Sequence, residues 1–134
     1  MSTTRGALRL SATDAGPDGQ ETWTDVCALD DIVPDTGVCA LLGERQVAVV
    51  RVGWGEEVYA LDNFDPVAKA FVLSRGIVGD AGGIVKIASP ITKRAFDLRT
   101  GRCLDEASVS VPVFDVRVRE GRVEVRTPPR VEAQ

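Results

Sequence analysis

The sequence predicts a mainly β protein: an antiparallel sandwich or barrel of short strands, with one short helix. Short apolar segments recur between turn residues, which is typical of sandwiches and barrels rather than of βαβ units. The segment 114–126 alternates between apolar and charged residues on both sides of Glu120-Gly121, the period expected of a β-hairpin. A single segment, 65–76, carries the residues of a helix.

The predicted strands follow one another with short turns between them. They cover residues 23–29, 38–42, 46–52, 57–61, 84–88 and 94–98. A turn is predicted at 34–37, where Pro and Gly occupy favourable positions. The segments on either side of Gly43-Glu44-Arg45 are almost continuously apolar, so they predict a hairpin that is buried on both faces.

The last hairpin has a register that can be derived from the sequence. If Glu120-Gly121 forms a two-residue turn, four pairs of residues face one another: Val118 with Val123, Val116 with Val125, Arg117 with Glu124, and Asp115 with Arg126. Opposite charges across a strand pair favour this register by about 0.2–1 kcal/mol for each pair.

The helix is predicted from its end signals. Asp65 suits the N-cap, Pro66 the first helical position and Gly76 the C-terminal cap. At helical spacing, four residues would share one face: Val67, Ala70, Phe71 and Ser74.

Length and charge limit the classes of protein. A chain of 134 residues fits one domain, and we expect an N-terminal disordered tail over 1–21, the domain over 22–126 and a C-terminal tail over 127–134. A net charge of −4 argues against nucleic-acid binding. The chain has no apolar segment of membrane-spanning length and no signal-peptide pattern. We therefore expect a cytoplasmic protein without membrane contact.

The chain contains no histidine, which excludes Ser–His and Cys–His nucleophile pairs and any imidazole ligand. Its three cysteines, Cys27, Cys39 and Cys103, are far apart; this favours reduced, buried thiols over a disulfide framework or a zinc site. We expect no metal and no catalytic residue. A basic cluster over 93–102 is interrupted by Asp97 and followed by Asp105 and Glu106. Its two interpretations are a solvated face or a contact for an acidic partner.

Two loops resemble the ligand loops of Rieske iron–sulfur domains, and the resemblance extends from Trp23 to Val125. Rieske ferredoxins have Asn-x-Cys-Pro-His in the first loop and Cys-Pro-x-His-Gly in the second, ahead of Phe-Asp-Leu-x-Thr-Gly. This chain has Asn-Phe-Asp-Pro-Val over 63–67, and Ser-Pro-Ile-Thr-Lys over 89–93 ahead of Phe-Asp-Leu-Arg-Thr-Gly. The four positions that correspond to cluster ligands hold Asp65, Val67, Ser89 and Thr92. A Rieske cluster needs two thiolates and two imidazoles, so the resemblance implies a Rieske-like antiparallel fold that has no electron-transfer site.

Within this superfamily the chain resembles the small subunits of assimilatory NAD(P)H-dependent nitrite reductases. The matching stretches cover residues 23–27, 31–43, 62–66, 72–76 and 88–90. The resemblance implies a large partner subunit that carries the flavin, the iron–sulfur cluster and the sirohaem and reduces nitrite to ammonium. Two alternatives remain at this point: an interaction module that serves another reductase, and a Rieske-type ferredoxin.

The resemblance also implies that the two loops lie together at one end of the domain. Without a metal, hydrogen bonds from Asp65, Ser89 and Thr92 would have to hold them. We expect this end to dock on the large subunit, with Phe64 and Phe71 as apolar anchors and a charged rim from Lys93 and Arg94.

Overall fold

The computed structural model describes residues 13–15 and 22–130. Its elements are, in order, β1 (Thr13–Ala15), β2 (Thr22–Ala28), η1 (Leu29–Asp31), β3 (Thr36–Leu42), β4 (Arg45–Val52), β5 (Glu57–Asp62), β6 (Phe64–Asp65), β7 (Ala70–Phe71), η2 (Leu73–Arg75), β8 (Ile77–Ala81), β9 (Ile84–Ala88), β10 (Ala95–Asp97), β11 (Val113–Arg119) and β12 (Arg122–Thr127). The two η elements are single 3₁₀ turns. Apart from β1, the tail predicted over 1–21 lies outside the described residues, as does the C-terminal tail beyond residue 130.

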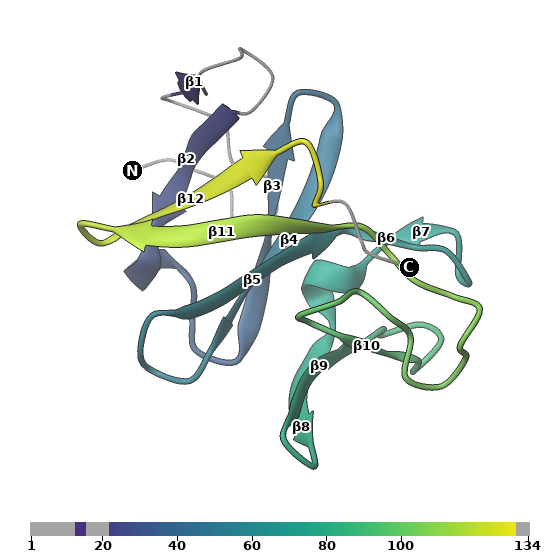
Figure 1. The fold of residues 1–134 in the computed structure, drawn as a ribbon. Coiled ribbons are helices and arrows are strands. Elements are labelled where there is room, and N and C mark those ends of the chain that lie inside the picture. The colour runs from purple at the N-terminus through teal and green to yellow at the C-terminus, as the bar shows by residue number, and fades with distance from the viewer. Residues whose placement is uncertain (1–12, 16–21, 131–134) are drawn as a thin grey trace.

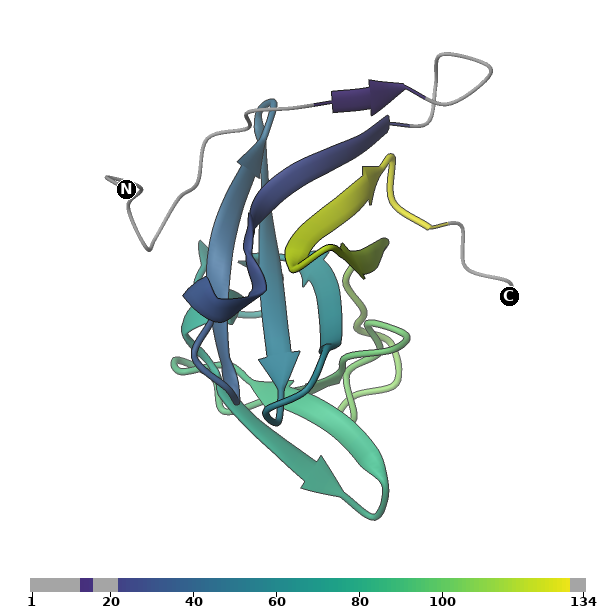
Figure 2. The same cartoon turned by 90° about the vertical axis from the view of Figure 1, so that its left-hand side faces the viewer.

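The strands form one large sheet and two small ones, all with antiparallel pairing. The large sheet has the order β1-β2-β12-β11-β5-β4-β3, and the small sheets have the orders β10-β9-β8 and β6-β7. The large sheet curls, so that β2 and β12 lie across from β3 and β4 (Figure 1, Figure 2). The predicted mainly β, antiparallel fold class is confirmed.

The core has two parts, which lie on opposite faces of the large sheet. The first fills the inside of the curl and includes Val47 and Val49 of β4. The second lies between the large sheet and the β8–β10 sheet and includes Ala48 and Val50 of the same strand. Successive β4 side chains thus alternate between two buried clusters. The predicted burial on both faces is confirmed for β4, whereas Leu41 of β3 remains 39% exposed.

The predicted register of the last hairpin is also confirmed. Arg117 lies opposite Glu124, and Asp115 lies opposite Arg126. The Arg117 Nε donates a hydrogen bond of 2.6 Å to Glu124 Oε1, and Arg126 forms an ion pair with Asp115. The Arg117 guanidinium also lies 3.9 Å from the ring centroid of Trp23 on β2, a cation–π contact that ties the hairpin to the next strand.

The helix predicted over 65–76 is wrong. Asp65 does cap a turn, but this turn ends at Lys69, whose φ is +56° and whose N–H donates to the Asp65 carbonyl (2.7 Å). The chain then returns as β7, so that residues 64–71 form a short hairpin. The physical reason is the lack of a core for the apolar face: Val67 remains 36% exposed and Phe71 53% exposed. A single helical turn without such burial is not continued.

Candidate functional site

The two loops that resemble ligand loops lie side by side at one end of the domain. The first comprises residues 63–71 and the second residues 89–94, and we refer to both together as the tip. The tip lies near the labels β6 and β7 in Figure 1. It is held to the domain by β5, which leads into the first loop, and by β9 and β10, which flank the second.

Asp65 joins the two loops. Its side chain is fully buried. Its Oδ1 accepts hydrogen bonds from the backbone N–H groups of Val67 (2.9 Å) and Ala68 (3.2 Å) in the first loop. Its Oδ2 accepts a hydrogen bond of 3.0 Å from Thr92 Oγ1 in the second loop. One carboxylate therefore closes its own turn and bridges to the other loop, through charge-assisted hydrogen bonds.

The hydrogen bonds of the tip also set the charge of Asp65. Burial raises the pKa of its carboxyl, but hydrogen bonds from Ser89, Ala68, Val67 and Thr92 lower it by more, so the pKa lies below its ordinary value. Donors that bind the ionised form favour that form. Asp65 is therefore an anion at neutral pH, stabilised by the hydrogen-bond donors around it.

Ser89 organises the second loop. Its Oγ accepts hydrogen bonds from the backbone N–H groups of Ile91 (3.2 Å) and Thr92 (3.3 Å). Its own N–H donates to the Arg94 carbonyl (2.8 Å), and its carbonyl accepts from the Lys93 N–H (3.0 Å). Small hydroxyl and carboxylate side chains close turns by such local bonds, so each loop is shaped by the residue at its first ligand-like position.

The structure brings together three of the four positions identified from the resemblance: Asp65, Ser89 and Thr92. Val67 does not join them, because it lies in the turn of the first loop with its side chain partly in solvent. Within residues 13–15 and 22–130, no group of three or more His, Cys, Asp or Glu side chains is placed to hold a metal ion.

Asn63 is a positioning residue that was not singled out from the sequence. Its side chain is buried and accepts a hydrogen bond of 2.6 Å from the Ser74 N–H. Its Nδ2 donates to Gln46 Oε1 (3.0 Å), and its backbone N–H donates to the Gln46 carbonyl (3.0 Å). Asn63 thus fixes the start of the first loop between β4 and η2. The only signal for it was its place as the first residue of the Asn-x-Cys-Pro-His pattern.

The three cysteines, all within the described part of the chain, are buried and form no disulfide. Burial raises the pKa of the Cys39 thiol, an effect that Arg75 partly offsets. A raised pKa leaves a thiol protonated and unreactive at neutral pH. The predicted burial of Cys27 and Cys39 is confirmed, but the Cys39 thiol also takes part in hydrogen bonds with Gln46 and Asn63.

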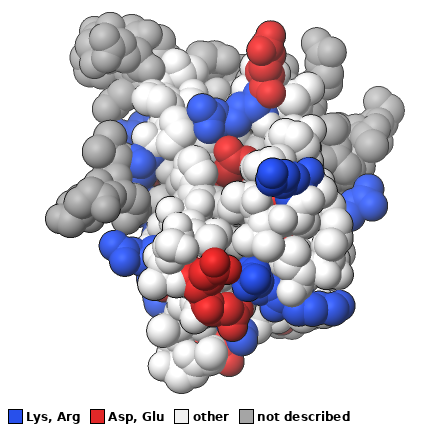
Figure 3. Space-filling view, turned by 90° about the vertical axis from the view of Figure 1, so that its right-hand side faces the viewer, with Lys and Arg blue, Asp and Glu red and all other residues white. Residues whose placement is uncertain are grey.

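The outer surface of the tip is apolar with a basic rim. The rings of Phe64 and Phe71 lie 4.9 Å apart, with Phe64 half-buried and Phe71 more exposed. Ile91 is exposed in the second loop. Lys69 and Lys93 are exposed beside these residues. Figure 3 faces this side of the molecule and shows basic side chains at several places among largely uncharged areas, with acidic side chains at the top, near the middle and in the lower part.

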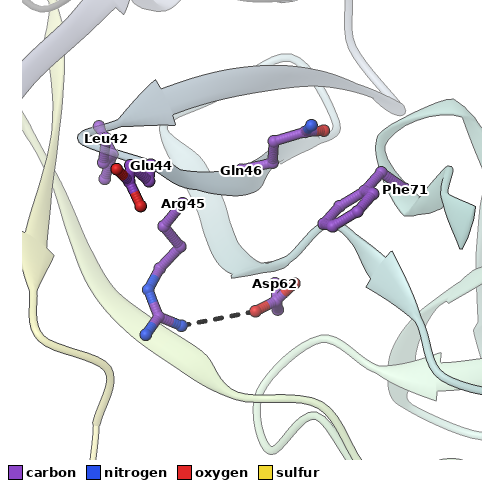
Figure 4. Close-up of a pocket in the computed structure, with 6 residues that line it drawn as sticks. All are labelled: Leu42, Glu44, Arg45, Gln46, Asp62 and Phe71. Carbon is purple, nitrogen blue, oxygen red and sulfur yellow. Dashed lines mark hydrogen bonds and ion pairs between the residues drawn. The ribbon is translucent and has the colours of Figure 1, made fainter.

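The exposed Phe71 also forms one wall of a shallow pocket of about 480 Å³. The remaining walls come from the β3–β4 turn and the end of β5, through Leu42, Glu44, Arg45, Gln46 and Asp62. Arg45 and Asp62 form an ion pair of 3.5 Å across the pocket (Figure 4). The pocket extends the tip surface toward the large sheet.

The model of the Rieske-like [2Fe-2S] domain family matches residues 22–126. This chain belongs to that family. It is 43% identical to the nitrite reductase (NADH) small subunit of Escherichia coli over 104 residues, which cover 78% of this chain and 96% of that protein. Among solved structures, it resembles a Mycobacterium tuberculosis protein described as a candidate NADH-dependent nitrite reductase small subunit, with a TM-score of 0.76 and 48% identity, over 84% of this chain and 98% of that one.

A further relative shows such a domain inside a longer polypeptide. The nitrite reductase [NAD(P)H] large subunit of Klebsiella oxytoca is 46% identical to this chain over 101 residues, which cover 75% of this chain and 10% of that protein. The predicted resemblance to nitrite reductase small subunits is confirmed by these relatives. In the described residues, no helix is long and apolar enough to cross a membrane.

Proposed function

We propose that this chain is the non-redox small subunit of a cytoplasmic NAD(P)H-dependent nitrite reductase that takes part in nitrate assimilation. Its large partner subunit would carry the flavin, the iron–sulfur cluster and the sirohaem and would reduce nitrite to ammonium. The small subunit would hold no cofactor and no catalytic residue. The similarity of almost the whole domain to nitrite reductase small subunits carries this proposal.

The hydrogen bonds of the tip support the non-redox part of the proposal. A Rieske cluster joins its two loops through two thiolates and two imidazoles. Here the chain has no histidine, and the bond between Thr92 and Asp65 joins the loops instead. Because the carboxylate already accepts hydrogen bonds from both loops, the loops keep a defined shape without a metal.

The surface of the tip supports a role in docking on the large subunit. Protein interfaces combine a few large apolar anchors with a polar rim. Phe71 and Ile91 provide exposed apolar anchors, and Lys69 and Lys93 lie beside them. The surface of the partner would then be apolar at its centre, with carboxylates around it.

The experiment that tests the proposal is co-purification of the tagged chain with the large sirohaem flavoprotein subunit, followed by iron analysis of each component. The expected result is a stable complex in which the iron belongs to the large subunit. Failure to bind that subunit would refute the proposed partner, and an alternative reductase recovered in its place would identify a module of another system. Two irons in each small subunit would show a ferredoxin.

The docking site can be tested with variants of the tip. Phe71→Ala and Lys93→Glu should each weaken binding to the large subunit by about tenfold, while circular dichroism shows an unchanged fold. Ile77→Ala is the matched control, because it removes an exposed apolar side chain from β8, outside the tip. If Phe71→Ala, Lys93→Glu and Ile77→Ala all bind the large subunit with the wild-type affinity, the docking surface lies elsewhere.

A further inference from the structure

The end of the domain opposite the tip presents an exposed tryptophan on two fixed loops. Trp54, in the turn between β4 and β5, is 84% exposed. Val33, in the loop between η1 and β3, is 61% exposed. In Figure 1 these two connections lie on the side away from the labels β6 and β7, and Figure 2 views the molecule from that side. We call residues 29–35 and 53–57 the Trp54 end.

Arg51, the penultimate residue of β4, holds the two loops of the Trp54 end together. Its side chain is buried, its guanidinium donates hydrogen bonds to four backbone carbonyls, and it forms a long ion pair of 3.9 Å with the exposed Asp30. In the β4–β5 turn these are Trp54 (2.7 Å) and Gly55 (3.1 Å). In the other loop they are Leu29 (3.4 Å) and Ile32 (3.0 Å). Burying a cation is costly unless its donors are used, and here they fix the loop backbone beneath an exposed indole.

Asp35 adds a second link between the two loops. Its Oδ1 accepts a hydrogen bond of 2.9 Å from the Gly53 N–H. Its own N–H donates to the carbonyl of Arg51 (2.8 Å). The turn that carries Trp54 is therefore tied to the η1–β3 loop on both sides of the strand end. Because the backbone beneath Trp54 is already fixed, little backbone conformational entropy is lost when a partner covers the indole, which favours binding.

The charge of this end is opposite to that of the tip. The segments 29–35 and 53–57 contain five carboxylates and no Lys or Arg. The two segments of the tip, 63–71 and 89–94, contain three cations and one carboxylate, that of the buried Asp65. Glu56 and Glu57 are exposed beside Trp54, and the Asp30 side chain is almost fully in solvent. A complementary partner surface would therefore have an apolar pocket for Trp54 and basic side chains around it.

We propose that the Trp54 end is a second docking surface, which takes a basic, apolar-centred surface of the nitrite reductase large subunit. The identity of this partner rests on the proposed function. A large exposed aromatic residue on a rigid base is typical of interface hot spots, in which tryptophan is enriched. Since the two surfaces lie at opposite ends of one domain, this chain bridges two regions of its partner rather than covering one.

The test is the affinity of the full-length chain for the purified large subunit, measured by calorimetry at two salt concentrations. Trp54→Ala should raise Kd by about tenfold or more. Glu56→Lys should raise Kd most at low salt, because charge reversal acts at long range only when it is not screened. Ile77→Ala is again the matched control and should bind as the wild type does. Because all three side chains are exposed, melting temperatures should stay unchanged.

The outcomes separate this inference from the proposed function. Wild-type binding that neither Trp54→Ala nor Glu56→Lys changes by more than twofold would refute the second surface and leave the small-subunit role intact. Absence of wild-type binding would refute the proposed function and, with it, the partner named here. Self-association of the chain that Trp54→Ala abolishes would assign the surface to a second copy and overturn the inference. If both surfaces are used, combining Trp54→Ala with Phe71→Ala should multiply the two losses.

Discussion

Removing the carboxylate of Asp65 should destabilise the whole domain, because both loops of the tip lose hydrogen bonds to it. In Asp65→Ala, two backbone N–H groups and the hydroxyls of Thr92 and Ser89 lose a charged acceptor. Hydrogen bonds to charged groups contribute about 1.5–3 kcal/mol each, but their effects are not additive and water can reach a loop. We therefore expect a loss of about 3 kcal/mol in the free energy of unfolding. Asp65→Asn keeps the size and one acceptor and should cost about 1.5 kcal/mol.

The pH dependence provides an independent measurement of the same bonds. The pKa of Asp65 is below its ordinary value of 3.8, so in acid the unfolded chain binds this proton more readily than the folded one. Stability from this group is then complete above the unfolded pKa and is lost as the pH falls through the folded pKa. We expect the wild type to lose this contribution below about pH 4. Asp65→Asn should lack that part of the acid-dependent loss.

Urea denaturation at pH 7 and at several values between pH 3 and 5 measures both effects. With an m value of about 1–3 kcal/mol/M, a loss of about 3 kcal/mol lowers the midpoint by about 1–3 M. Thr92→Val removes the bond of Thr92 to Asp65 together with the longer one that its hydroxyl accepts from the Arg94 N–H (3.4 Å). Thr92→Ser, which keeps the hydroxyl, is its control. Asp65→Asn and Thr92→Val share the bond between the loops, so the double variant should lose less than the sum of the single losses. Additive losses, or an acid slope unchanged in Asp65→Asn, would refute the bridge.

Three further predictions concern the missing cluster, the last hairpin and one glycine. The purified chain, reconstituted anaerobically with iron and sulfide, should show no Rieske visible or spin-resonance spectrum; a stoichiometric two-iron cluster would contradict this. Exchanging the charges of Arg117 and Glu124 together should cost less than reversing either alone, although the double change still loses the contact of Arg117 with Trp23; equal costs in thermal unfolding would exclude the pairing. Gly101→Ala should destabilise the domain strongly, because its φ is +80° and a Cβ would lie 2.1 Å from the Val111 carbonyl oxygen. Gly82→Ala, where φ is +60° and the Cβ would meet no neighbour, should cost only about 1–2 kcal/mol. Similar melting temperatures for the two variants would contradict this packing.

The long hairpins could be predicted because their signals are local. The alternation over 114–126 and the apolar segments around Gly43-Glu44 each determine a strand pair and its turn. Other elements have no such signal. The strands β6 and β7 are two residues long, which is too short for a period, and β8 contains Gly79 and Asp80, which are typical turn residues. The helix prediction used correct end signals, but end signals do not provide a surface on which a helix can bury its apolar face.

The site was harder to predict than the fold, because its bonds are non-local. Thr92 and Asp65 are 27 residues apart, and only the resemblance to Rieske loops brought them together before the structure was known. Arg51 reaches carbonyls that lie 19 and 22 residues earlier in the chain. In the sequence it is one polar residue at the end of an apolar strand. Backbone carbonyls accept hydrogen bonds at every residue, so the sequence gives no indication of which ones a buried arginine will meet.

Strand β4 connects the two ends of the domain mechanically. Gln46, near its start, binds Asn63 and so fixes the first loop of the tip. Arg51, near its end, fixes the loops of the Trp54 end. The two residues are roughly 17 Å apart along the strand, at about 3.4 Å per residue, and the residues between them are buried on both faces. A strand packed on both sides cannot bend without opening both cores, so the two surfaces keep a fixed separation. The two surfaces are therefore pre-organised, and this chain loses little conformational entropy when a partner contacts both of them.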